Sequence, residues 1–180
     1  MVLDEIGRGL SQLGVDVNGA WRQAAHARGL GCQGYNIFGE LQGIGVKVTQ
    51  EVVEAYNVPF VTWTVAHLPL ALDLGLSLKS HGAVAAQPSR PADPRLDIST
   101  GDAGIDQGFA LHADEASRAQ ALIDESFCTV LREHVNPQTD VEISDNGVRI
   151  AQMGVATQVA PLLWSIDATV ALARALDAGR

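Results

Sequence analysis

The chain has 180 residues, 47% of them hydrophobic and 18% charged, and its 12 basic and 21 acidic residues give a formal net charge of −9. This composition is typical of a globular protein and excludes collagen, a coiled coil and disorder over the whole length. A chain of this length buries enough apolar surface to fold without a metal or a disulfide.

The charge also excludes classes of partner. Lys47 and Lys79 are the only lysines, and the ten arginines are scattered along the chain. Binding to nucleic acid depends on clustered cations that neutralise phosphates, and no such cluster exists here. We therefore expect neither a nucleic-acid partner nor an anionic membrane surface. The first residues lack the basic and apolar regions of a signal peptide, so the expected location is cytoplasmic.

The first 80 residues change from a helical to a strand pattern at Gly31. Before it, apolar residues recur at helical spacing, and Asn18 is a candidate N-cap. After it, β-branched and aromatic residues dominate, and in the last segment five leucines alternate with small or polar residues. The predicted elements are helices at 1–13 and 18–28 and strands at 31–40, 44–49, 58–67 and 70–79.

Residues 81–108 are rich in proline and glycine, including Pro88, Pro91 and Pro94. A stretch of this length without a periodic pattern is uncommon inside a compact domain. We interpret it as a connector between two halves, 1–80 and 109–180, of one domain that spans 1–180.

The second half has clearer signals for helix caps and turns. Asp114 is placed to cap a long amphipathic helix, and the Asp145-Asn146-Gly147 sequence is typical of a hairpin turn. The hairpin register would pair Val141 with Ile150, Ile143 with Val148 and Glu142 with Arg149. The predicted elements are a strand at 108–113, a helix at 114–134, strands at 141–144 and 148–151, and a helix at 161–178.

The expected fold class is therefore α+β, a mostly antiparallel sheet with helices packed on one face. The predicted order is α-α-β-β-β-β, the long connector, then β-α-β-β-α. Because no repeated β-α-β-α-β alternation appears, we do not expect a doubly wound parallel sheet.

No motif in the sequence identifies a catalytic centre, a cofactor or a metal site. The glycines between Gly29 and Gly45 match neither phosphate-binding pattern. Cys32 and Cys128 lie in no metal-ligand spacing and are expected to be reduced, although a disulfide between them remains an alternative.

The densest group of potential metal ligands is His112 with Asp114 and Glu115. Two or three such residues are too few for a zinc site unless a further histidine joins them, and Asp114 has the competing role of helix cap. Metal binding through His112 and Asp114 is thus a minor hypothesis. The Asp102 segment also fails the EF-hand pattern, because Gln107 and Ala113 stand where glycine and glutamate are required.

The final helix is apolar on nearly all sides. Such a helix must be enclosed by its own domain or by a partner. Gln158, Asp167 and Arg174 make it a poor membrane span. If it forms an interface, the candidate residues are Leu163, Trp164 and Val170.

These observations favour a non-catalytic protein-interaction or assembly module that self-associates through the final helix, with another copy or another protein as partner. The alternative is a small-molecule-binding protein or enzyme with a pocket between sheet and helix, lined by Trp63, His67 and His112. Convergence of His67, His81 and His112 on one cavity would favour this alternative, and their dispersal would favour the module.

Overall fold

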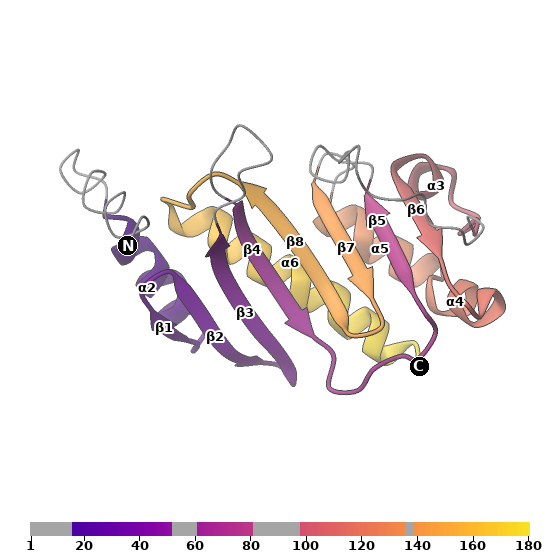
Figure 1. Ribbon diagram of the computed structural model, residues 1–180, viewed down its shortest axis with the longest axis horizontal. Coiled ribbons are helices and arrows are strands. Elements are labelled where there is room, and N and C mark those ends of the chain that lie inside the picture. The colour runs from indigo at the N-terminus through magenta and orange to yellow at the C-terminus, as the bar shows by residue number, and fades with distance from the viewer. Residues whose placement is uncertain (1–15, 52–60, 81–97, 136–138) are drawn as a thin grey trace.

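The computed structural model describes residues 16–51, 61–80, 98–135 and 139–180 (Figure 1). Eight strands form one sheet in which every neighbouring pair is antiparallel, in the order β1-β2-β3-β4-β8-β7-β5-β6. The predicted α+β fold class is confirmed. The strands are β1 (Gly31–Gln33), β2 (Asn36–Leu41), β3 (Ile44–Glu51), β4 (Val61–His67), β5 (Ser77–Ser80), β6 (Phe109–His112), β7 (Asp140–Ser144) and β8 (Gly147–Met153).

The sheet joins segments that are far apart in the sequence. β1 to β4 form a meander at one side, and β4 then pairs with β8 through a register that includes Val65 opposite Arg149. β5 does not follow β4 in space but lies between β7 and β6. Strands from both sides of residues 81–97 therefore share one continuous sheet.

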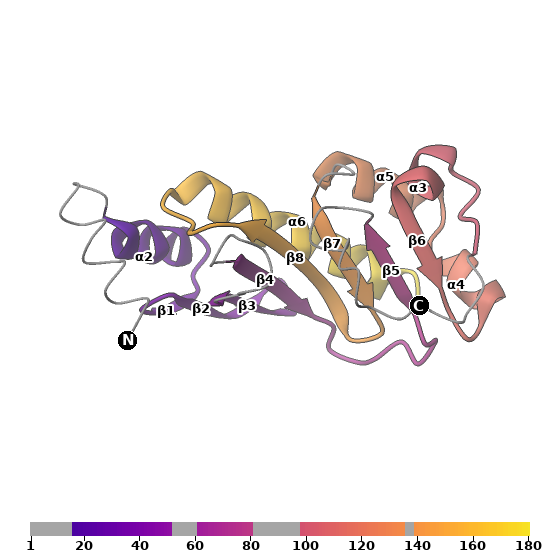
Figure 2. The same ribbon diagram turned by 45° about the horizontal axis from the view of Figure 1, so that its top comes forward.

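The larger helices lie on one face of this sheet (Figure 2). α6 (Val159–Ala178) packs against β3, β4 and β8 and lies between α2 (Val17–Ala27) and α5 (Glu125–His134). Two short helices, α3 (Ala103–Gly108) and α4 (Ala116–Leu122), are found near the β6 end of the sheet. The prediction of helices on one face agrees with this arrangement.

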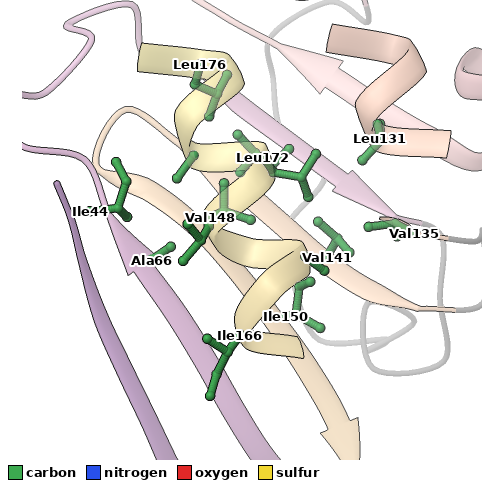
Figure 3. Packing of buried hydrophobic residues seen from close by; sticks show 14 of the residues in the cluster. Ile44, Ala66, Leu131, Val135, Val141, Val148, Ile150, Ile166, Leu172 and Leu176 are labelled. Atoms are coloured by element: carbon green, nitrogen blue, oxygen red, sulfur yellow. The ribbon is translucent and has the colours of Figure 1, made fainter. Parts of the chain in front are cut away.

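The apolar composition of α6 follows from its position. Figure 3 shows its side chains directed at the inner strand residues, and the buried hydroxyls of Thr64 and Ser165 lie 2.9 Å apart at the same contact. Within the described residues, α6 is the helix long and apolar enough to cross a membrane, and 50% of that window is buried in the protein. The packed residues labelled in Figure 3 include Ile44, Ala66, Val148, Ile150, Ile166, Leu172 and Leu176.

The hairpin of β7 and β8 has the predicted register. Val141 pairs with Ile150, Ile143 with Val148, and Glu142 lies opposite Arg149. The two apolar pairs and the turn residues agree on one pairing, because a shift by one residue would expose the whole apolar set.

The predicted strand at 70–79 is wrong over most of its length, since only Ser77–Ser80 is a strand. Asp73 and Gly75 have positive φ angles of 54° and 61°, which an extended strand does not permit. The alternating leucines from Leu72 to Leu78 are nevertheless buried, whereas Leu70 is 69% exposed. The segment is held instead by the Asp145 carboxylate, which accepts hydrogen bonds from the backbone N–H groups of residues 74, 75 and 76 at 2.9–3.1 Å.

Other boundaries also differ from the predictions. The single strand at 31–40 is divided into β1 and β2 by a turn in which Gly34 has a φ of 58°. The long helix at 114–134 is broken, because Asp124 accepts a hydrogen bond from the Phe127 N–H and starts α5 as a new N-cap. Asp16, not Asn18, caps α2. The helix predicted at 1–13 and most of the connector lie outside the described residues.

Candidate functional site

The face of the sheet opposite α6 is covered by none of the described helices, and we call it the open face. Side chains alternate between the two faces of a strand. Because Thr64 of β4 contacts Ser165 of α6, its neighbours Trp63 and Val65 point to the open face. The register then assigns residues of every other strand to one face or the other.

A row of six residues, four of them charged, crosses the open face, and we call it the charged row. Its members pair in sequence from β2 to β5, in the order Phe38, Lys47, Val65, Arg149, Glu142 and Lys79. Lys79 and Glu142 form an ion pair with 3.0 Å between Nζ and Oε1. Both lysines of the chain are thus in this row, and together with Arg149 they offset locally the negative charge of an acidic protein.

Arg149 lies over the indole of Trp63, with 3.5 Å between the guanidinium carbon and the ring centroid. This is the geometry of a cation–π contact, which favours Arg over Lys because the planar guanidinium stacks on the ring. The Trp63 Nε1 atom is buried and has no hydrogen-bond partner. The stack fixes one flat, amphipathic group at the centre of the open face.

Two large apolar side chains are exposed on the same face. Phe38 of β2 is 50% exposed and Met153 of β8 is 45% exposed. A hollow of 260 Å³ lies on this face toward the turn between β7 and β8, lined by Val65, His67 and Arg149 among others. Exposed apolar groups surrounded by charged ones are typical of an interaction surface.

The structure places Trp63, His67 and His112 on the open face and not between sheet and helix. His67 and His112 belong to one row of the sheet, which runs through Gly147, Ser144 and Ser77. Four strand spacings of about 4.8 Å separate the two histidines, which is on the order of 19 Å. They cannot bind one small ligand together, and His81 lies outside the described residues.

The three interface candidates on α6 differ in exposure. Trp164 is 38% exposed, Leu163 is partly buried against the core, and Val170 is only 3% exposed. Nearby, Asp167 accepts two hydrogen bonds from Arg28, at 2.6 and 2.5 Å, which ties α6 to α2. Val170 therefore packs inside the domain, and Trp164 is the candidate that offers surface.

Neither metal nor thiol chemistry is supported in the part of the chain that the structure describes. No group of three or more His, Cys, Asp or Glu residues there could hold a metal ion. Burial raises the pKa of both Cys32 and Cys128, so the thiols stay protonated and are weak nucleophiles. Neither is in a disulfide. The N-cap of α4 is Glu115, and its side chain makes no capping hydrogen bond, so the predicted capping role of Asp114 is wrong.

The sequence interpretation missed Phe38, Lys47 and Met153 as surface residues. Part of the signal existed. Strand alternation and the hairpin register together place Arg149 on the face opposite Ile150, and the same alternation places Met153 on the face of Arg149. The order in which distant strands pair was not visible, so the row across six strands could not be assembled.

No model of a known protein family matches the sequence, and no curated protein matches it. The chain is similar in structure to the mycobacterial trehalose monomycolate transport factor A, known from a crystal structure, with a TM-score of 0.60 and 12% sequence identity. The match covers 89% of this chain and 94% of the other. At this identity the likeness shows the shared fold.

Proposed function

We propose that this protein is a non-catalytic assembly module that binds a second copy of itself through the open face. The observation that carries the proposal is the exposure of Phe38 and Met153 on the sheet face that holds the Arg149–Trp63 stack and that none of the described helices covers. A protein that shares the fold is a transport factor, which supports an accessory role in place of catalysis.

Charge favours the open face over other surfaces. Two copies that each carry −9 repel one another, so they associate best where that charge is locally offset. Lys47 and Arg149 lie in the middle of the face, whereas Glu40 and Glu51 lie near strand ends. A two-fold interface places each residue against a different residue of the second copy, so cations and carboxylates can pair across it.

A second candidate surface is α6, where Trp164 is 38% exposed. Tryptophan is enriched among residues that dominate interface energies. Because Ile166 and Val170 are buried in the core, only the outer side of α6 is available, and this surface has fewer large apolar groups than the open face.

Sedimentation of the full chain tests both surfaces. Concentrations from about 1 to 100 μM suit a dissociation constant near the micromolar level. Phe38→Glu changes the open face, Trp164→Glu changes α6, and Ser117→Glu is a control on exposed α4. We expect the wild type to dimerise, Phe38→Glu to weaken the dimer at least about tenfold, and the control to have no effect.

The pattern of results separates the alternatives. A dimer lost only in Trp164→Glu would transfer the interface to α6. A wild type that stays monomeric over the whole range would refute self-association through either surface. Circular dichroism of each variant checks that it is folded.

A further inference from the structure

A cavity of 360 Å³ lies away from the open face, between the loop at Ala71–Leu74, helix α4 and the C-terminal end of α6. In both Figure 1 and Figure 2 the end of α6 is close to α4 at the lower right. We propose that this cavity is a binding site for a small anionic amphiphile, a single carboxylate attached to a short alkyl chain.

The floor of the cavity is apolar and held in place. Leu72, Leu74 and Leu122 line it and are 8%, 4% and 6% exposed. The loop that carries the first two is fixed by the Asp145 carboxylate, and the Asp114 N–H donates to the Leu74 carbonyl at 2.9 Å. A largely preformed apolar floor is what binding sites for small molecules generally provide.

Two arginines, Arg118 and Arg180, line the same cavity. The Arg118 guanidinium is 2.9 Å from Glu115, and these side chains are 62% and 52% exposed. Arg180 is 2.9 Å from Asp177 and also donates to the Leu70 carbonyl. Exposed ion pairs of this kind contribute little, so a ligand carboxylate can replace Glu115 or Asp177 at small cost.

The balance of charge at the rim selects the ligand. Each guanidinium is paired with one carboxylate, so a ligand that replaces one of these partners fits better with a single negative charge than with the two charges of a phosphate. The apolar floor requires that the remainder of the ligand be hydrocarbon. A group of water size occupies about 30 Å³ in a liquid, so the roughly ten non-hydrogen atoms of octanoate need about 300 Å³.

Titration calorimetry on the full chain tests the site with sodium octanoate, sodium propionate and 1-octanol. Octanoate is expected to bind at one site with a dissociation constant between about 10 μM and 1 mM. Propionate lacks the chain and 1-octanol lacks the charge, so both are expected to bind at least about fivefold more weakly.

Two variants locate the site and one serves as control. Arg118→Gln removes one cation from an exposed position and is expected to weaken octanoate binding about three- to fivefold. Ala121→Trp places a large side chain at the cavity and is expected to abolish binding. Arg174→Gln, on the exposed side of α6 where Arg174 contacts Gln42, is expected to leave binding unchanged.

Absence of saturable octanoate binding at about 1 mM would overturn the proposal. Equal affinity for 1-octanol, or equal octanoate affinity in Arg118→Gln and the wild type, would overturn recognition of the anion. Binding retained in a folded Ala121→Trp variant would show that octanoate binds elsewhere.

Discussion

The two faces of the sheet use alternate residues of the same strands in different ways. On β8, Ile150 is fully buried beneath α6, whereas Met153 is 45% exposed on the open face. The covered face is selected for volume and close packing, and the open face combines charged, aromatic and apolar groups. Stability and interaction therefore depend on opposite sides of one sheet, so a substitution on one side should affect one property and leave the other nearly unchanged.

The largest effect is expected from a cavity in the covered face. Ile150→Ala removes buried atoms from the contact with α6 and should lower the free energy of unfolding by about 3 kcal/mol. Met153→Ala on the same strand should cost less than about 1 kcal/mol, because the side chain is already half in water. Urea denaturation measures both, and equal losses would remove the distinction between the faces.

A smaller loss is expected at the turn between β7 and β8. Asp145→Ala removes the acceptor of three backbone N–H groups and should destabilise the protein by about 2 kcal/mol. Asp145→Asn keeps one acceptor oxygen and should cost less. If the octanoate site depends on this loop, its affinity should fall in Asp145→Ala as well, and an unchanged affinity would separate the cavity from the loop.

On the open face, Arg149→Ala should reduce stability by about 0.5–1 kcal/mol, the value of a partly exposed cation–π contact. Arg149→Lys should restore part of it. Arg149→Ala should also weaken any dimer formed through this face. Thermal melting measures the loss of stability, and sedimentation measures the loss of dimer. A large loss of stability would mean that Arg149 belongs to the core.

The smallest effect concerns pH, at a site remote from both faces. Burial acts to raise the pKa of Asp106, but hydrogen bonds from Ser99 and Thr100 outweigh it and hold that pKa below its ordinary value. The Asp106 carboxylate therefore adds stability when the pH is above its unfolded-state pKa of about 3.9. This contribution is lost as the pH falls through the lower folded-state pKa.

Asp106→Asn should accordingly lower the melting temperature slightly at pH 7, and the difference from the wild type should vanish in strong acid. The exposed position of Asp106 keeps the effect small. A difference that stays constant down to about pH 2 would show that the carboxylate charge is not involved.

Local signals predicted the parts of the fold that local chemistry decides. The β7–β8 register followed from alternation and the Asp145-Asn146-Gly147 turn, and the last helix followed from its apolar composition. The strand predicted at 70–79 failed because alternating leucines can be buried without a ladder when a distant carboxylate satisfies the backbone. The break at Asp124 was marked in the sequence by a good capping residue, but the periodicity on both sides concealed it.

Less of the candidate site than of the fold could be predicted from the sequence. The predicted residues Trp63, His67 and His112 do share one face, which alternation along each strand determines. Their separation depends on β8, β7 and β5 lying between β4 and β6, and this order is set by non-local pairing. Lys47 and Arg149 become neighbours across β4 for the same reason, so the charged row had no linear signature.

The pairing of β4 with β8 also has a consequence for synthesis on the ribosome. Residues 61–67 can pair with β3 early, but their second partner strand is absent until residues 147–153 have been made. Until then β4 has an unpaired edge, which other chains could join. Contacts between such distant segments form slowly. This protein should therefore complete its sheet only after residues 147–153 have been made, and the nascent chain should be most prone to aggregation while the hairpin of β7 and β8 is still missing.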